Sequence, residues 1–393
     1  MSKKFSIFSV YGIEAEYMIV NKTTLKVVPM ADKIIQKLNQ GKIVNEVELG
    51  EVSWSNELVN HVLEIKSTIP QSDLVKMESQ FHKSIKDVNE ILSEYDCQLM
   101  PTAMHPWFQP LEETKLWPHG QRDIYKLYDE IFDCKGHGWS NLQSIHINLP
   151  YSNEEEFRRL HSAVRCVLPL IPYFSASSPY YEGKPGSLAC NRLGFYEKNQ
   201  AKIPSIIGNI IPEVYENTKK YKEMLKTIYQ EISVYDNAKT LQHPWLNSRA
   251  AIPKFDVGAI EIRLMDIQES PYMDFTLIHL FIALVKHVAG KSISLAESLS
   301  DQKLRKIYEE AKTYQPQISD TEYFELFDVS GKNMEEFSQN LMQKFRSEIP
   351  SRYHKGLETF ITRGNLSRRL TQSSLSEEKY RTLTQILQKN EVF

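Results

Sequence analysis

The chain has 393 residues, of which 41% are hydrophobic and 25% are charged, so it has the composition of a soluble globular protein with one large domain or two. A formal net charge of −3 gives no reason to expect nucleic acid or an anionic membrane as a partner. The four cysteines include no C-x-x-C pair, which argues against a zinc site or a disulfide framework and fits a reducing cytoplasm. The N-terminal stretch MSKKFSIFSVYGIEAE lacks the apolar core and the small-residue cleavage site of a secretory signal.

Three short runs alternate polar and apolar residues, which is the pattern of a β-strand with two different faces. They read G-I-E-A-E-Y at residues 12–17, S-I-H-I-N-L at 144–149 and I-E-I-R-L at 260–264. Their polar faces carry Glu14 and Glu16, then Ser144, His146 and Asn148, then Glu261 and Arg263. Carboxylates gathered on one sheet face repel each other unless a cation lies among them. The pattern therefore predicts a metal–phosphate site built on a sheet.

Helical patterns separate and follow these strands. Ser72 is expected to cap a helix with an apolar stripe from Leu74 to Leu92, and Asn153 to cap a helix with an acidic first turn. Pro212 is expected to begin a long helix that continues through Ile232. Beyond about Ser270 the strand signals end, and helices are expected at residues 275–288, 302–311, 334–345 and 377–387. The apolar run at 277–285 is too short for a membrane span of about 20 residues and predicts a core helix.

This order of elements predicts an α+β protein that forms one unit over residues 1–393. The sheet-bearing catalytic core is expected at about 1–270 and a helical C-terminal portion at about 271–393. No internal repeat or low-complexity tract interrupts the chain, and no linker is evident.

Five segments in this order resemble the motifs of the glutamate–cysteine ligase family. They are G-I-E-A-E at 12–16, N-E-L-V-N-H-V-L-E-I at 56–65, S-I-H-I-N at 144–148, the loop at 174–196, and I-E-I-R at 260–263. The resemblance implies a glutamine-synthetase-like fold, with a largely antiparallel sheet, a concave active-site face and helices on the other face. It also implies an ATP-dependent carboxylate–amine ligase. In that reaction the γ-carboxylate of glutamate, or a similar acid, attacks ATP, and an amine such as cysteine then attacks the acyl phosphate.

The resemblance further implies roles for individual residues. Metal ions, Mg²⁺ with Mn²⁺ as a substitute, would be held by Glu14, Glu16, Glu57, Glu64, His146 and Glu261. Arg263 and Arg192 would be catalytic and contact phosphate, and Glu14, Asn148 and Arg263 would bind the nucleotide. The chemistry suits these roles, because Mg²⁺ prefers oxygen ligands and a guanidinium keeps its charge and can fork onto phosphate.

Two features depart from the family pattern. Many bacterial members carry H-V-H-V-G where this chain has S-I-H-I-N, although His146 is kept. Glu57 and Glu64 are an odd number of residues apart, which would place them on opposite faces of a regular strand. Either a bulge intervenes or Glu57 precedes the strand.

Ordinary structural roles compete with several of these assignments. Glu261 and Arg263 could pair only with each other, Arg192 could cap a helix C-terminus, and Asp266 is expected to be structural. The basic cluster Arg363, Arg368 and Arg369 is expected to be a solvated helix end. His105 and His243 both precede proline and fit turns better than metal ligation. The loop Y-Y-E-G-K-P-G at 180–186 is either a mobile cover for the site or an ordinary surface loop.

The sequence leaves three classes of function open. The leading hypothesis is the ATP- and Mg²⁺-dependent ligase; the alternatives are a kinase-like phosphotransferase on a related fold and a non-catalytic relative that binds ATP or metal. The last is disfavoured because the acidic set, His146 and Arg263 are all present. The expected partners are small molecules, namely an amino acid, an amine and ATP, for a cytoplasmic protein without nucleic acid or membrane partners. A homo-oligomeric state stays open.

Overall fold

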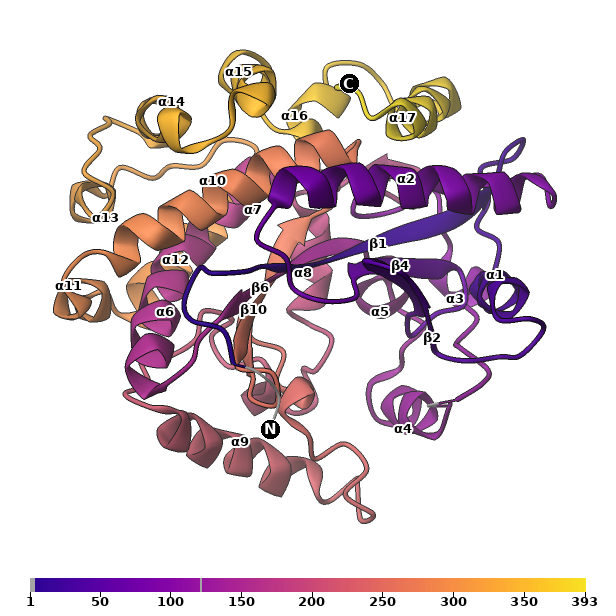
Figure 1. The fold of residues 1–393 in the computed structure, drawn as a ribbon, viewed down its shortest axis with the longest axis horizontal. Helices are drawn as coiled ribbons and strands as arrows, with labels where there is room; N and C mark the ends of the chain where they lie inside the picture. The colour runs from indigo at the N-terminus through magenta and orange to yellow at the C-terminus, as the bar shows by residue number, and fades with distance from the viewer. Residues whose placement is uncertain (1–3, 121) are drawn as a thin grey trace.

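An eight-stranded sheet runs through the centre of the molecule in the computed structural model, which describes residues 4–120 and 122–393 (Figure 1). Every ladder between the named strands of this sheet is antiparallel. The strand order is β2 (Glu46–Leu49), β3 (Val52–Asn56), β4 (Val62–Ser67), β1 (Gly12–Asn21), β6 (Ser144–Pro150), β10 (Ala259–Asp266) and β9 (Ala251–Lys254), with β5 (Cys97–Met100) also paired to β1. No secretory signal is expected in residues 1–16, and residues 1–3 of that stretch lie outside the described residues.

The register brings polar side chains of four strands onto one face of the sheet. Glu16 of β1 lies opposite Glu64 of β4, and Glu14 lies opposite His146 of β6. Asn148 of β6 lies opposite Glu261 of β10. Because residues directly opposite each other in adjacent strands share a face, these side chains line the same surface.

The other face of the sheet is apolar and is covered by helices. Ile13 and Tyr17 of β1 and Ile147 of β6 are buried in the core, together with Phe81 and Ile85 of helix α2 (Leu74–Ser93). Full burial of such a side chain stabilises the fold by about 1.5–3 kcal/mol. Figure 1 shows α2 and α10 (Pro271–Ala289) on this side of the sheet and α4 on the opposite side. The alternation seen in the sequence thus separates a helix-covered face from a polar one.

The remaining elements of the first part connect and flank the sheet. They are α1 (Ala31–Leu38), α3 (Pro110–Glu113), α4 (Arg122–Phe132), α5 (His137–Ser140), α6 (Glu154–Val167), α7 (Ile171–Ser175), α8 (Asn191–Tyr196), α9 (Thr218–Ile232) and a hairpin of β7 (Tyr180–Tyr181) and β8 (Lys184–Pro185). Asn153 caps α6 as predicted, because its side chain accepts a hydrogen bond from the Glu156 amide.

After Asp266 the named elements of the described chain are helical. They are α10, α11 (Ile293–Ser298), α12 (Asp301–Ala311), α13 (Thr321–Glu325), α14 (Met334–Phe345), α15 (His354–Arg363), α16 (Leu366–Leu370) and α17 (Glu377–Lys389). The helices predicted at 275–288, 302–311, 334–345 and 377–387 are confirmed as α10, α12, α14 and α17. In Figure 1 α14 to α17 lie on the outer side of α2 and α10.

Two predicted helix starts were wrong. Asp73, not Ser72, caps α2, because its carboxylate accepts a hydrogen bond from the Lys76 amide. The helix expected from Pro212 begins only at Thr218, with Asn217 as its cap. The Pro212 carbonyl instead accepts a hydrogen bond from the buried Arg165 side chain, so this segment packs as a loop.

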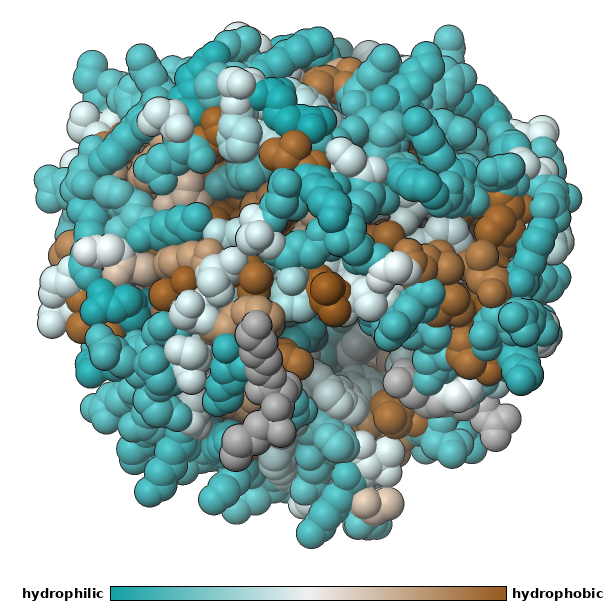
Figure 2. Space-filling view, in the orientation of Figure 1, coloured by the Kyte–Doolittle hydropathy of each residue, from teal (hydrophilic) through white to brown (hydrophobic). Residues whose placement is uncertain are grey.

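One helix in the described part of the chain, α10, is long and apolar enough to cross a membrane by length and composition alone. However, 78% of its apolar window is buried inside the molecule, as expected for the predicted core helix. The face of the molecule in Figure 2 is mainly hydrophilic, with smaller hydrophobic areas between the polar residues. All four cysteines are free and buried.

Candidate active site

Glu14, His146 and Glu261 converge on the polar face of the sheet. One ligand atom from each lies within 4.8 Å of the others. The His146 Nδ1 atom is 3.2 Å from Glu14 Oε2 and 3.9 Å from Glu261 Oε1. The three side chains come from β1, β6 and β10, so their proximity follows from the strand order. This arrangement fits the geometry of a cation site.

A second acidic group lies beside the first, around the β1–β4 pair. Glu16 accepts hydrogen bonds from the Ser144 amide at 2.8 Å and the Ser144 hydroxyl at 3.0 Å. Glu64 accepts a hydrogen bond from the Ser55 hydroxyl at 2.6 Å. Glu57 follows β3 and precedes β4, so its odd spacing from Glu64 arises from the turn between two strands and needs no bulge.

The carboxylates of the two groups titrate differently because their neighbours differ. Burial alone would raise the pKa of Glu14, but its hydrogen bond with His146 and the charge of Lys254 hold that pKa well below its usual range. Burial, together with the negative charges of Glu16, Glu64 and Glu14, holds the pKa of Glu57 well above its usual range. The second group is therefore short of positive charge.

Two lysines contact these carboxylates and were not predicted from the sequence. The Lys254 ammonium is 2.8 Å from Glu14 Oε1 and also forms an ion pair with Glu261. The Lys66 ammonium is 3.2 Å from Glu64 Oε1. Lys66 could have been found, because it stands two residues after Glu64 in an alternating run. Lys254 carried no such signal, because β9 reads A-I-P-K without alternation.

Arg263 belongs to the same polar face. Its Nε atom is 2.5 Å from Glu261 Oε1, so the predicted pairing of these two residues is present. Burial alone would lower the pKa of Arg263, but the charge of Glu261 and the Tyr196 hydroxyl raise it. Arg263 therefore stays cationic and lies beside the candidate metal ligands.

The donor set suits a hard divalent cation. It consists of carboxylate oxygens with one imidazole, which fits Mg²⁺ or Mn²⁺ better than a soft metal. Asn148 donates a hydrogen bond from Nδ2 to Glu14 at 3.0 Å, while its Oδ1 atom is buried without a partner. A buried amide oxygen without a partner is unfavourable unless a ligand or ion completes it. The residues present therefore fit a divalent ion with oxygen ligands.

A cavity of about 430 Å³ opens onto this face of the sheet. Its polar floor includes Glu16, His146 and Arg263. The rest of its lining is built largely from aromatic and apolar residues of α4, α5, α8 and the turn after His243: Ile124, Tyr125, Tyr128, Trp139, Tyr196 and Trp245. The volume falls within the usual range of small-molecule sites, about 300–1,000 Å³.

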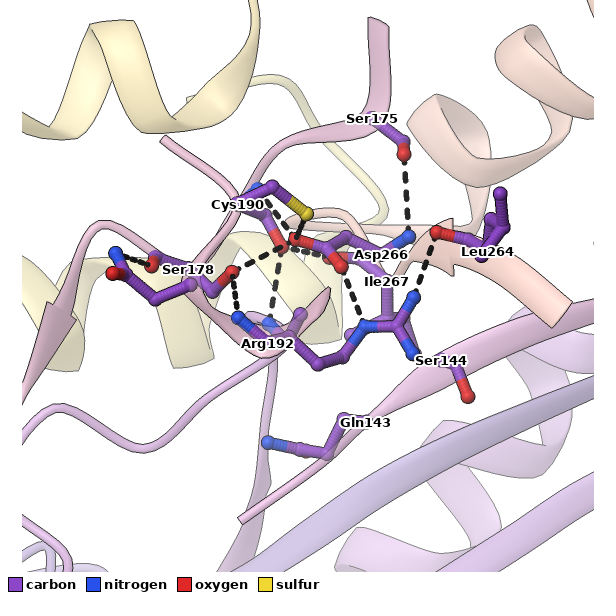
Figure 3. A network of polar contacts seen from close by, with 12 residues as sticks. Gln143, Ser144, Ser175, Ser178, Cys190, Arg192, Leu264, Asp266 and Ile267 are labelled. Carbon is purple, nitrogen blue, oxygen red and sulfur yellow. Dashed lines mark hydrogen bonds and ion pairs between the residues drawn. The ribbon is translucent and has the colours of Figure 1, made fainter. Parts of the chain in front are cut away.

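Arg192 borders the cavity but is held by Asp266 (Figure 3). The Arg192 Nε atom is 2.6 Å from Asp266 Oδ1, and Nη2 donates to the Leu264 carbonyl at 2.7 Å. Asp266 also accepts hydrogen bonds from Ser178 and Cys190. Arg192 lies in the first turn of α8, so the alternative that it caps a helix C-terminus was wrong. Its contact with phosphate remains a prediction.

Other candidates do not themselves line the cavity. The loop at 180–186 forms the β7–β8 hairpin, and none of its residues lines the cavity. His105 is buried, with Nε2 2.7 Å from the Leu25 carbonyl, and His243 stacks on Trp245. The expectation of a solvated cluster was wrong for Arg369, which is buried and pairs with Glu269.

Comparison with known proteins finds a matching family. A family model described as glutamate–cysteine ligase family 2 matches residues 10–382. The chain belongs to this family. The resemblance predicted from the motifs is thus confirmed.

Relatives differ in how much of the chain they share. A protein of Archaeoglobus fulgidus described as uncharacterized is 37% identical over 68% of this chain and 71% of its own length. A relative from Bradyrhizobium diazoefficiens is 24% identical over 61% of this chain, and the match spans only 53% of that relative. A glutamate–cysteine ligase of Haloquadratum walsbyi is 21% identical over 64% of this chain and 63% of its own length.

Among solved structures, the glutamate–cysteine ligase of Francisella tularensis in complex with AMP is similar, with a TM-score of 0.65. The two chains are 13% identical, and the match covers 98% of this chain and 90% of that one. The similarity shows a shared fold, so the predicted α+β, glutamine-synthetase-like fold class is confirmed.

Proposed function

We propose that this chain is an ATP- and Mg²⁺-dependent ligase that joins the γ-carboxylate of glutamate, or a similar acid, to an amine. The observation that carries the proposal is the shared face of the sheet. Candidate metal ligands from four strands share this face. Of these residues and their neighbours, Glu16, Glu57, His146 and the cationic Arg263 line one cavity of suitable size. Membership of the ligase family and the fold of a relative that binds AMP support the use of ATP.

The residues fall into two candidate cation sites. Glu14, His146 and Glu261 would hold one divalent ion, and Glu16, Glu57 and Glu64 would hold a second. When bound, the ions would neutralise phosphate charge and orient the terminal phosphoryl group. Asn148, whose Oδ1 atom has no partner, would bind the nucleotide together with Glu14 and Arg263.

The reaction has two steps in this proposal. A γ-carboxylate oxygen attacks the terminal phosphorus of ATP, a new O–P bond forms, and the bond to the β-phosphate oxygen breaks, so that ADP leaves with its electron pair. The amine nitrogen then attacks the acyl carbon, a C–N bond forms and the C–O bond to phosphate breaks. Inorganic phosphate leaves and takes up the proton released by the nitrogen. Arg263 stabilises charge on the phosphoryl group during the first step.

Water must be excluded from the acyl phosphate, because water would hydrolyse it before the amine attacks. The aromatic side of the cavity can exclude water from the floor once substrates are bound. We further propose that residues 1–393 act as a single ligase domain in the cytoplasm, with small-molecule substrates as partners.

The test is an ADP-release screen with glutamate and a panel of amines, followed by mass analysis of the product. We expect ADP to form with glutamate, to form faster with the correct amine, and to be accompanied by an amide. Methionine sulfoximine, which mimics the tetrahedral adduct once phosphorylated, should inhibit in a time-dependent, ATP-requiring way. ADP release that no amine accelerates, with a phosphorylated acid as product, would favour the kinase alternative. Magnesium–ATP binding without turnover of any acid–amine pair would favour a non-catalytic relative.

A further inference from the structure

Three aromatic side chains form one wall of the cavity, which we call the aromatic wall: Tyr128, Trp139 and Trp245. The ring centroids of Tyr128 and Trp139 are 5.5 Å apart, and those of Tyr128 and Trp245 are 6.0 Å apart. Trp245 is 37% exposed, so part of its ring is open to contact. The rings come from three separate segments, α4, α5 and the turn after His243. Tyr128 belongs to the hydrophobic core and Trp139 packs against it, whereas Trp245 is partly exposed.

Two polar atoms beside this wall have no hydrogen-bond partner. The Trp139 Nε1 atom is buried and unpaired, and so is the Gln200 Oε1 atom. Gln200 is only 2% exposed, and its Nε2 atom donates to the Ser248 hydroxyl at 2.9 Å, which fixes the orientation of the amide. Both Trp139 and Gln200 line the cavity. A buried donor and a buried acceptor left unpaired are unfavourable unless a ligand satisfies them.

We propose that the aromatic wall binds the acceptor amine and that this amine carries an aromatic ring, as in an aromatic amino acid or an arylalkylamine. The inference rests on the proposed function and names the substrate class of its second step. The ring packs against Tyr128 and Trp245, while polar groups of the amine accept from Trp139 and donate to Gln200. Its nitrogen is then directed toward the floor that carries His146 and Arg263.

The exposed part of the wall is mainly the Trp245 ring, which is 37% exposed. A cysteine presents a single thiol beyond its β-carbon, so it would leave more of that ring in contact with water than an aromatic acceptor would. An aromatic acceptor buries its own ring against the wall, and each aromatic pair adds about 0.5–1.5 kcal/mol beyond area burial. An aliphatic diamine could use the rings through cation–π contacts, but it has no acceptor for the Trp139 N–H group. An aromatic acceptor can satisfy both unpaired atoms: its carboxylate or hydroxyl group accepts from Trp139, and a hydroxyl or an N–H of the amine donates to Gln200.

The experiment compares aromatic with non-aromatic acceptors, using the whole chain of residues 1–393. Glutamate and magnesium–ATP are supplied with L-phenylalanine, L-tyrosine or tyramine, and in parallel with L-leucine, L-cysteine or putrescine. We expect kcat/KM for the best aromatic acceptor to exceed that for L-leucine by about tenfold or more. Trp245→Ala and Gln200→Leu should each raise the KM for that amine by about tenfold while the KM for glutamate changes little. Tyr314→Ala is the matched control, because Tyr314 is 39% exposed but lines a different cavity.

The outcomes separate the inference from the proposed function. Amide formation with L-cysteine or putrescine in clear preference to every aromatic amine would overturn the inference and leave the ligase intact. If no amine accelerates ADP release, the proposed function fails, and saturation-transfer NMR with tyramine then decides the inference alone. Tyramine binding that is lost in both Trp245→Ala and Gln200→Leu would support the aromatic subsite. Absence of binding, or binding unchanged in both variants, would overturn it.

Discussion

Lys254 places its ammonium 2.8 Å from the Glu14 carboxylate, although the two residues are 240 positions apart in the sequence. The same ammonium forms an ion pair with Glu261. Lys254 therefore contacts two of the three side chains that converge as a candidate cation site. A divalent ion that binds there must share these carboxylates with the lysine or displace it.

Replacing Lys254 with Met removes that competing charge while keeping most of the side-chain length. We expect the Lys254→Met variant to bind Mn²⁺ more tightly, by roughly tenfold, because a unit charge a few ångströms away opposes a cation by more than about 1.4 kcal/mol at partly buried sites. Titration with Mn²⁺ followed by electron paramagnetic resonance measures this without turnover. Lys76→Met is the control, since Lys76 pairs with the exposed Glu51. Weaker Mn²⁺ binding in Lys254→Met would mean that the lysine supports the site.

The parts of this site that could be predicted from the sequence are those with a period of two. Glu14, Glu16, His146 and Glu261 belong to runs whose apolar neighbours are buried on the other face of the sheet. The sequence of these runs therefore alternates between polar and apolar residues. The spacing of Glu57 and Glu64 left two explanations open, a bulge or a Glu57 that precedes the strand. The register of β3 and β4 shows that the second is correct.

The rest of the site depends on contacts between distant segments. Trp139, Gln200 and Trp245 meet only in the folded chain, and the H-P-W sequence at 243–245 indicates a turn and nothing more. Residue type alone also did not predict the burial of two neighbouring arginines in one helix. Arg368 is exposed, whereas Arg369 is fully buried against Glu269. No local pattern distinguishes the two arginines.

Glu64 is predicted to hold a metal ion rather than to stabilise the sheet. The Glu64→Gln change keeps the shape and the hydrogen bond with Ser55 but removes the charge. We expect folding to survive and turnover at limiting Mg²⁺ to fall by roughly 100-fold or more. Glu46→Gln is a matched control, because Glu46 contacts the same Lys66 from the exposed edge strand. Near-normal turnover of Glu64→Gln at limiting Mg²⁺ would refute the assignment.

Arg263 is predicted to stabilise charge on the transferring phosphoryl group. Arg263→Lys keeps the positive charge but loses the planar fork. We expect kcat to fall by roughly 10- to 100-fold, with the Kd for ATP changed by less than about threefold. Single-turnover kinetics and equilibrium ATP binding give the two quantities. If ATP binding weakens while turnover is retained, Arg263 only binds the nucleotide.

His161 should make the protein sensitive to acid. Both of its ring nitrogens are buried without a partner, and burial, followed by the nearby charge of Arg165, lowers its pKa to about 3. The unfolded histidine titrates near about 6.5, so between about pH 6.5 and 3 only the unfolded chain takes up this proton. Stability due to His161 is therefore present above about pH 6.5 and is lost as the pH falls, by about 1.4 kcal/mol per unit.

The His161→Phe variant keeps a ring stacked on Phe157 and removes the titrating group. We expect the loss of unfolding free energy between pH 7 and pH 5 to shrink by about 2 kcal/mol in this variant. Urea unfolding at the two pH values measures the difference. His82→Phe is the control, because the His82 ring bonds to the Gln388 carbonyl near the surface. Equal losses in wild type and His161→Phe would contradict the prediction.

Arg369 and Glu269 form a buried ion pair that joins α16 to the segment after β10. Both side chains are 0% exposed, the Nη1–Oε1 distance is 2.5 Å, and Arg369 Nη1 also donates to the Phe393 carbonyl at 3.0 Å. Arg369→Leu leaves the Glu269 charge buried and unpaired, so we expect a loss of about 3–5 kcal/mol in unfolding free energy. Adding Glu269→Leu removes that unpaired charge and should recover much of the loss. Arg368→Leu, on the same helix but exposed, should change stability by less than about 0.5 kcal/mol. Denaturant unfolding measures the unfolding free energy of these variants. If Arg369→Leu loses no more unfolding free energy than Arg368→Leu, the pair does not hold the C-terminal helices against the core.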